Sequence, residues 1–181
     1  MSFTGSLSRP VTSTTPSLHS RSYPRWTDDL QGLRKRLQDA WSDATIHESF
    51  RSPAGVQVMP SHGQCAVTSA WLIETLAAAH VRNLTYCTGD LYSMDAPGQL
   101  DLEHHAWVEV TYADDRLVVD LTSDQSTLLR PQPVTYAWHD DLQTLHRIDY
   151  RTHHRLTPLQ LQYDPIHTRL AALKQALQSE R

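Results

Sequence analysis

The chain has 181 residues, a hydrophobic share of 39% and a formal net charge of −4. This length is sufficient for one domain with a substantial core, and the acidic balance offers no basic field for a nucleic-acid backbone. The two cysteines are too few for a disulfide framework, and the sequence contains neither a secretory-signal pattern nor an apolar run of about 20 residues. We therefore expect a cytoplasmic protein whose partners are neither nucleic acids nor membranes.

The N-terminal residues 1–25 are rich in Ser, Thr and Pro, which predicts a flexible or arm-like segment ahead of a single domain at residues 26–181. A first helix is predicted from Thr27, its expected N-cap. The apolar stripe of this helix consists of Leu30, Leu33, Leu37 and Trp41. Its other face is expected to be solvated and carries Arg34, Lys35, Arg36 and Asp39. Residues 42–60 then form a predicted loop with a short strand at 56–59.

Residues 61–70 place a cysteine at the start of an apolar helix. Gly63 supplies the turn before Cys65, and the helix runs without Gly or Pro as far as His80. Because it is apolar most of the way round, this helix should be buried. A thiol at its N-terminus would lie in the positive end of the macrodipole, which favours thiolate, beside backbone N–H groups that could hold an oxyanion. A small buried core cysteine is the other interpretation of Cys65.

After this helix, a strand is predicted at residues 83–88, pairing with a hairpin further along the chain. Cys87, within that strand, is expected to be an inert core thiol. Residues 89–102 are expected to form an exposed loop near the entrance of the site. A last edge strand is predicted at 147–150, and a C-terminal helix at 165–179.

The hairpin is predicted from alternating apolar residues at 103–112 and 116–121, separated by the turn composition of residues 113–115. On the first strand the core-facing residues are Ala106, Val108, Val110 and Tyr112, and on the second they are Leu117, Val119 and Leu121. His105 and Asp120 therefore lie on the two arms of the hairpin, on the face opposite these core residues.

The turn decides whether His105 and Asp120 can meet. A turn at residues 113–114 places Asp120 opposite Trp107, diagonal to His105 on the same face, where Cβ atoms are about 7–8 Å apart. A turn at residues 114–115 would instead place Asp120 opposite Glu109, which is too far from His105 without a bulge. The sequence leaves both registers open.

The residues His105-Ala106-Trp107-Val108-Glu109-Val110, followed by Asp120-Leu121-Thr122, resemble the His and Asp segments of transglutaminase-like and other papain-like cysteine enzymes. The spacing of Cys, His and Asp is also similar to that of arylamine N-acetyltransferases, although their Arg-Gly-Gly before the cysteine is missing. Closer still, Gly63-Gln64-Cys65-Ala66-Val67-Thr68 with the segment at 120–125 resembles the YunG-like group of small bacterial proteins. The resemblance covers roughly residues 41–125.

This resemblance implies an α+β, papain-like fold in which the cysteine-bearing helix packs on an antiparallel sheet carrying His and Asp. It implies a triad in which Cys65 is the nucleophile, His105 the base and Asp120 the group that orients the imidazole. The residues expected to bind the oxyanion or the substrate are Gln64, His62, Trp107 and Gln125. The implied activity is thiol-dependent hydrolysis, deamidation or transamidation of an amide, ester or thioester.

Three other interpretations remain open at this point. A catalytically inactive papain-like domain could serve as a binding module, and a small-ligand carrier could use the Tyr and Trp residues. Zinc could in principle be bound by Cys65, His62, His104 and His105, but the sequence has no His-Glu-x-x-His helix and no second cysteine near the first, so neither a metal nor another cofactor is expected. The substrate, whether a peptide, a protein or a small acyl donor, is not identified by the sequence.

Overall fold

The central element is a five-stranded sheet with the strand order β4-β3-β2-β1-β5, in which every neighbouring pair is antiparallel. The computed structural model describes residues 21–53, 56 and 58–179, so most of the predicted N-terminal arm lies outside the described residues. The strands are β1 (Leu84–Ser93), β2 (Leu100–Tyr112), β3 (Asp115–Asp120), β4 (Thr135–Trp138) and β5 (Ile148–Leu156). The chain is therefore an α+β protein, as the sequence predicted at that level.

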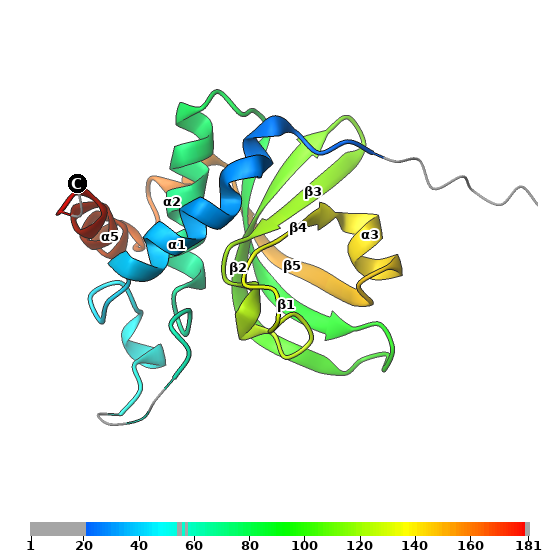
Figure 1. The fold of residues 1–181 in the computed structure, drawn as a ribbon, viewed down its shortest axis with the longest axis horizontal. Helices are drawn as coiled ribbons and strands as arrows, with labels where there is room; N and C mark the ends of the chain where they lie inside the picture. The colour runs from blue at the N-terminus through cyan, green and yellow to red at the C-terminus, as the bar shows by residue number, and fades with distance from the viewer. Residues whose placement is uncertain (1–20, 54–55, 57, 180–181) are drawn as a thin grey trace, which may run out of the picture.

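Helices cover the two faces of the sheet unequally (Figure 1). On one face lie α1 (Leu30–Ala40), α2 (Cys65–Ala78), α4 (Pro158–Leu161) and α5 (His167–Ser179), while α3 (His139–Thr144) lies on the other. Short 3-10 turns occur at Arg25–Asp29 (η1), Glu48–Phe50 (η2) and Ser123–Gln125 (η3). Helix α2 begins at Cys65 and is buried most of the way round, as its composition predicted.

The sheet has a hydrophobic core on each face. Leu72 of α2 packs with Val108 and Val119 in the larger core, and Leu142 of α3 packs with Trp107 in the smaller one. The alternation in the sequence indicated only the first of these cores. Because the second face is also covered, the side chains on it, including those of His105 and Asp120, are removed from water.

The hairpin of β2 and β3 has the first of the two registers considered above. Tyr112 pairs with Asp115 and Val108 with Val119, so the turn residues are Ala113 and Asp114. Ala113 adopts a left-handed backbone conformation (φ 51°), which fits a tight turn between twisted strands. This register brings Asp120 beside the middle of β2, where His105 lies.

Helix α1 differs from its prediction in where it begins and in which residues it exposes. It begins at Leu30 after the 3-10 turn η1, not at Thr27. Arg34, expected on the solvated face, is only 4% exposed; it donates to Asp124 Oδ2 at 2.9 Å and lies over the Trp41 ring at 4.2 Å. Burial lowers the pKa of Arg34, an effect that Asp124 opposes. This arginine therefore attaches α1 to the turn η3.

Other predicted boundaries also changed. The loop predicted at residues 89–102 is shorter and comprises residues 94–99, because β1 continues to Ser93 and β2 starts at Leu100. The described residues Val56, Val58 and Met59 form no strand. Ahead of α1, Tyr23 packs edge-on against Tyr136 with ring centroids 5.2 Å apart.

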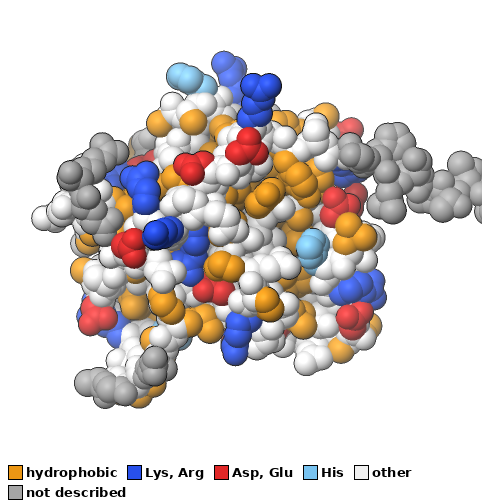
Figure 2. All heavy atoms as spheres, in the orientation of Figure 1, with side chains coloured by type: hydrophobic (Ala, Val, Ile, Leu, Met, Phe, Trp, Pro, Cys, Tyr) orange, Lys and Arg blue, Asp and Glu red, His pale blue; other side chains and the backbone are white. Residues whose placement is uncertain are grey.

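The surface carries acidic and basic side chains that are interspersed on the face seen in Figure 2. That mixture agrees with the small net charge of the chain. Within the described part of the chain, every helix is too short or too polar to cross a lipid bilayer.

Candidate active site

Cys65 is the first residue of α2, and the turn before it is tightly packed. Gly63 has a φ of +67°, and a Cβ on it would lie 2.9 Å from Ile46 Cγ2 and 3.0 Å from Phe50 Cβ. Glycine is therefore required here both by the backbone conformation and by the space available. The Cys65 side chain is 8% exposed, and its thiol donates a weak hydrogen bond to the carbonyl oxygen of His104, with 4.0 Å between the two atoms.

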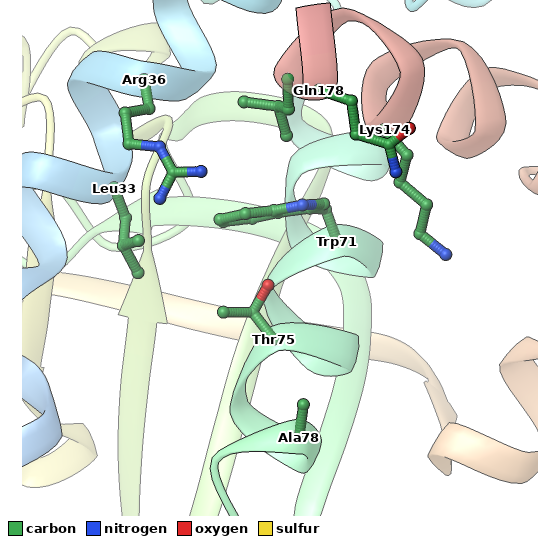
Figure 3. A pocket seen from close by; sticks show the side chains of 8 residues that line it. Leu33, Arg36, Trp71, Thr75, Ala78, Lys174 and Gln178 are labelled. Carbon is green, nitrogen blue, oxygen red and sulfur yellow. The ribbon is translucent and has the colours of Figure 1, made fainter. Parts of the chain in front are cut away.

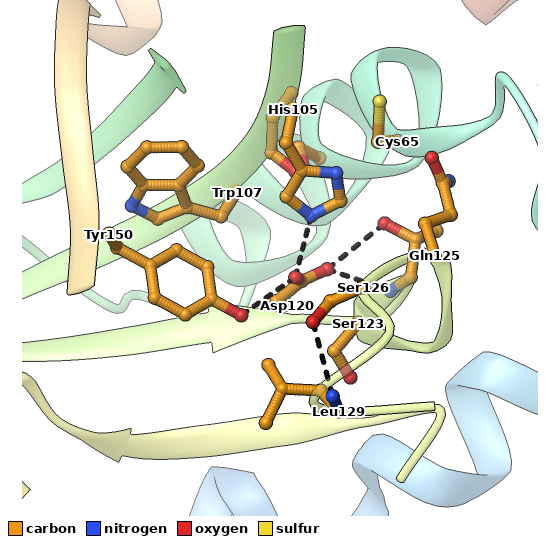
Figure 4. A network of polar contacts seen from close by, with 12 residues as sticks. Cys65, His105, Trp107, Asp120, Ser123, Gln125, Ser126, Leu129 and Tyr150 are labelled. Atoms are coloured by element: carbon orange, nitrogen blue, oxygen red, sulfur yellow. Dashed lines mark hydrogen bonds and ion pairs between the residues drawn. The ribbon is translucent and has the colours of Figure 1, made fainter. Parts of the chain in front are cut away.

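His105 and Asp120 form a direct, buried contact. Nε2 of His105 lies 2.6 Å from Oδ2 of Asp120, and both side chains are completely shielded from solvent. The same carboxylate oxygen accepts a hydrogen bond from the Tyr150 hydroxyl at 3.0 Å. Oδ1 accepts from the backbone N–H of Thr122 at 2.8 Å and from its hydroxyl at 3.0 Å. With four donors directed at it, the Asp120 carboxylate is held in one orientation (Figure 4).

Each partner shifts the ionisation of the other. Burial by itself would lower the pKa of His105, but the Asp120 carboxylate and, to a smaller extent, Cys65 outweigh it, so the pKa is raised. Burial would raise the pKa of Asp120, yet His105 and the bonds from Thr122 hold it below its usual value. A protonated imidazole paired with a carboxylate is therefore a favourable state of this buried pair.

The second ring nitrogen of His105 is free. Nδ1 is buried and has no hydrogen-bond partner among the described residues. In Figure 4 this nitrogen lies on the side of the ring that faces Cys65. The thiol is close enough to the ring to contribute to the raised pKa of His105, although its hydrogen bond is directed at the His104 carbonyl. The imidazole thus has one nitrogen fixed by the acid and the other directed toward the sulfur.

A β-bulge sets the position of His105. The pairing of β1 with β2 shifts between Gly89, which pairs with His105, and Leu91, which pairs with Leu102. Within the bulge, His104 adopts a left-handed φ of 53°, and its N–H is bound by Asp90 Oδ1 at 3.0 Å. A strained non-glycine residue beside a candidate catalytic group is typical of functional sites. The bulge also turns the His104 carbonyl toward the thiol.

Gly89 allows β5 to approach this bulge. A Cβ on Gly89 would lie 1.9 Å from the carbonyl oxygen of Arg151 on β5. Because that atom belongs to the backbone, no side-chain movement could relieve the clash. Glycine at this position therefore brings β5, and with it Tyr150, close enough to reach Asp120.

Trp107 does not have the substrate-binding role expected from the sequence. It is fully buried, stacks against His105 with centroids 6.3 Å apart, and meets Tyr150 edge-on at 5.1 Å. Its indole N–H donates to Glu109 at 3.3 Å, and Glu109 is in turn bound by Arg155 at 2.7 Å. A substrate cannot reach this ring. Trp107 supports the imidazole from the second core.

The expected oxyanion-binding role of the Gln64 side chain is likewise contradicted. Gln64 is 1% exposed, its Oε1 accepts from the Thr45 hydroxyl at 2.8 Å, and its Nε2 donates to the Ser42 carbonyl at 3.4 Å. These bonds use the amide to fix the segment that precedes the cysteine turn. The side chain is therefore directed away from the thiol.

His62 and Gln125 do lie at the pocket that contains the thiol. This pocket has a volume of about 130 Å³. Its lining consists of Phe50, Met59, His62, Gly63, Cys65, Leu102, Glu103, His104 and Gln125. Gln125 donates from Nε2 to the Ser61 carbonyl at 2.5 Å, which ties the turn η3 to the cysteine turn. Two of the four predicted binding residues thus border the pocket.

A larger pocket, of about 370 Å³, lies away from the thiol, between α1, α2 and α5 (Figure 3). Trp71 lies at its centre, with Arg36 and Lys174 on either side. Lys174 is already paired with Glu74. This pocket contains none of the predicted site residues, so its size does not make it the centre of the chemistry. Among the described residues, no group of three His, Cys, Asp or Glu side chains is placed to hold a metal ion.

Sequence reasoning missed Tyr150, Thr122 and Asp90 as contributors to the site. Tyr150 lay in a predicted edge strand, but nothing in its surroundings indicated a contact with Asp120, 30 positions earlier. Thr122 carried a usable signal, because a Thr two residues after an Asp can donate to that carboxylate through its backbone N–H.

Removing the Tyr150 hydroxyl is expected to destabilise the fold. Tyr150→Phe deletes one donor to a buried, charged acceptor, which typically costs about 1.5–3 kcal/mol. The free energy of unfolding in urea measures the loss. Tyr136→Phe is the matched control, because the Tyr136 hydroxyl makes no hydrogen bond to another described side chain. Equal stability of both variants would contradict a contribution from the bond between Tyr150 and Asp120.

The site thus contains a thiol at the start of a buried helix, an imidazole whose free nitrogen faces that thiol, and a carboxylate that fixes the other nitrogen. Such a set can carry out nucleophilic catalysis on a carbonyl group. No family model, curated protein or solved structure matches the chain.

Proposed function

We propose that this protein is a cysteine-nucleophile acyl-transfer enzyme built on a papain-like, transglutaminase-like domain. Its reaction would be hydrolysis, deamidation or transamidation of an amide, ester or thioester. The main support is the imidazole of His105: Nε2 is fixed by Asp120 at 2.6 Å, while Nδ1 is buried, unpartnered among the described residues and on the side of Cys65. A buried nitrogen left without a partner is costly unless it has a use.

In the proposed first step, Nδ1 of His105 holds the proton taken from Cys65, in agreement with the raised pKa of this histidine, and the sulfur attacks the carbonyl carbon of the substrate as a thiolate. A change of the Cys65 rotamer from the His104 carbonyl toward the ring would align the two groups. Active-site contacts in unliganded proteins are often longer than in the reacting complex. As the bond to the leaving group breaks, the leaving group takes the proton from His105, and an acyl-enzyme remains on the sulfur.

The second step releases the acyl group. Water or an amine attacks the thioester of the acyl-enzyme, giving its proton to Nδ1, and the sulfur leaves as the new bond forms. Asp120 keeps the proton of His105 on Nε2 throughout, so Nδ1 remains available to accept one. The oxyanion of both steps would be stabilised by backbone N–H groups in the first turn of α2, which lack intrahelical partners.

A catalytically inactive binding module remains the second candidate. It is favoured by the low exposure of Cys65, at 8%, and by the contact of its thiol with a backbone carbonyl. In that case the thiol would be a small, buried side chain at the base of a pocket.

Alkylation by iodoacetamide distinguishes the two candidates. We expect Cys65 to be labelled rapidly at neutral pH, because thiolate rather than thiol is the reactive species. Cys87 serves as an internal control, since burial, and to a smaller extent Glu109, raise its pKa to about 12. Mass spectrometry of peptides from the labelled protein locates the modification.

A Cys87→Ala variant should be labelled at the same rate as the natural chain. A Cys65 that is inert in the folded protein but labelled in urea would contradict the enzyme and support the binding module.

A further inference from the structure

The pocket beside Cys65 restricts which acyl group can be attached to the sulfur, an inference that rests on the proposed function. Apolar side chains of Phe50, Met59 and Leu102 form much of its lining. These residues come from the turn η2, from the segment before the cysteine and from β2. Gly63 packs directly against Phe50, which fixes that part of the wall.

The volume of the pocket limits the group that fits. Sites that enclose a whole drug-sized ligand usually measure about 300–1,000 Å³. The pocket at Cys65 measures about 130 Å³. An apolar cavity of about 150 Å³ accommodates benzene, so this pocket suits a group of about four to six carbon atoms. It therefore holds one part of a substrate.

The charges at the pocket limit the group further. Glu103 is the only Asp, Glu, Lys or Arg among the residues that line it, and its side chain is exposed at the rim. An acyl group with a carboxylate at its far end would be repelled by the negative charge of Glu103. No lysine or arginine among the lining residues could pair with that carboxylate, and it would lose its hydration against the apolar walls.

We propose that the pocket binds the acyl portion of an uncharged, short-chain aliphatic acyl donor of about four to six carbons. The acyl group stays bonded to Sγ after the leaving group has departed, so the space that adjoins Sγ must contain it. In the reaction with a thioester, the bond from Cys65 Sγ to the acyl carbon forms while the bond from that carbon to the leaving sulfur breaks. The leaving sulfur takes the proton that His105 had received from Cys65. Water then releases the carboxylic acid and restores the thiol.

The test uses N-acetylcysteamine thioesters with acetyl, butyryl, hexanoyl, decanoyl and succinyl groups and follows release of the free thiol. Each buried methylene contributes about fourfold, so the two additional methylenes of butyryl should raise kcat/KM roughly fifteenfold over acetyl. It should reach its maximum at butyryl or hexanoyl and fall at decanoyl. Succinyl has the same carbon count as butyryl but a charged end, and should be at least roughly tenfold poorer.

Three variants at the rim or wall of the pocket test the cause of this selectivity and leave the proposed triad unchanged. Glu103→Lys should raise the ratio of kcat/KM for the succinyl thioester to kcat/KM for the butyryl thioester, whereas Glu103→Gln should change that ratio less. Met59→Ala should move the maximum toward longer chains, because it enlarges the pocket. Circular dichroism and thermal unfolding establish that each variant is folded.

The outcomes separate this inference from the proposed function. Equal rates for all chain lengths, or succinyl as good as butyryl, would overturn the acyl-pocket inference while leaving a cysteine enzyme in place. A Cys65 that is alkylated by iodoacetamide but cleaves none of the thioesters would overturn it as well. A Cys65 that neither alkylates nor cleaves any thioester would overturn the proposed function itself.

Discussion

Cys65→Ala is expected to abolish thioester cleavage while leaving the fold intact. None of the other residues lining the pocket is a Cys, Ser, Thr or Lys that could replace the sulfur. Cys87 is buried in the second core on the other face of the sheet. Loss of the nucleophile in a comparable triad costs on the order of 10⁶-fold in rate, so only background hydrolysis should remain. Steady-state release of the thiol measures the effect.

The fold should tolerate this replacement, because the hydrogen bond from the thiol to the His104 carbonyl is weak, with 4.0 Å between the two atoms. The thermal midpoint of Cys65→Ala should therefore stay within a few degrees of that of the natural chain. Cys87→Ala is the matched control and should retain the full rate. Undiminished cleavage by a folded Cys65→Ala protein would mean that the reaction takes place elsewhere on the molecule.

Local patterns in the sequence were sufficient to predict the elements that carry the proposed triad. Helix α2 follows from an uninterrupted apolar run that begins at Cys65. The contact between His105 and Asp120 follows from strand alternation and from a turn at residues 113–114. Helix α2 depends on residues that are neighbours in the sequence, and the contact between His105 and Asp120 depends on one short hairpin. Simple periodicity is therefore sufficient to predict both features.

Features that depend on distant segments could not be predicted. Tyr150 reaches Asp120 only because β5 pairs with β1, and that approach requires Gly89. The bulge at His104 depends on Asp90, fourteen residues earlier, in a region predicted to be an exposed loop. Nothing local distinguishes a glycine needed for strand packing from one in a turn.

Contacts with distant segments also explain why the predicted roles of two residues were wrong. Trp107 alternates onto the face of His105, but a second core beneath α3 covers that face and excludes a substrate. Gln64 lies next to the nucleophile in sequence, yet its amide is bonded to Thr45 and Ser42. Adjacency in sequence therefore located these residues near the site without determining where their polar groups point.

The four donors around Asp120 determine how the amide of the Asp120→Asn variant is expected to be oriented. The backbone N–H of Thr122 cannot reverse its direction, so the asparagine oxygen is expected to stay on that side. The amide NH₂ then replaces the oxygen that faced His105 and Tyr150. The Tyr150 hydroxyl can rotate to accept a hydrogen bond. His105 can do so only by moving its proton from Nε2 to Nδ1, which is the tautomer that cannot accept the Cys65 proton.

We therefore expect Asp120→Asn to remain folded and to lose about 10⁴-fold in kcat, as the corresponding change does in a serine triad. Thioester turnover measures the loss, and Asp101→Asn is a control, since Asp101 contacts Ser126 and Thr127 rather than His105. A turnover within a few fold of the natural chain would show that Asp120 does not orient the ring during catalysis.

The pH dependence of stability gives an independent measurement of the same pair. Asp120 has a lowered pKa and His105 a raised one, so their stabilisation is complete between the unfolded-state values, about 3.9 and 6.5. Below this window the advantage of the natural chain over Asp120→Asn should shrink, because the unfolded carboxylate takes up a proton that folded Asp120 resists. Above it the advantage should also shrink, because the unfolded imidazole has already lost the proton that folded His105 retains. Urea unfolding of the natural chain and of Asp120→Asn, measured at pH values within, below and above this window, gives the difference between their free energies of unfolding. A difference that did not change with pH would contradict a charged pair.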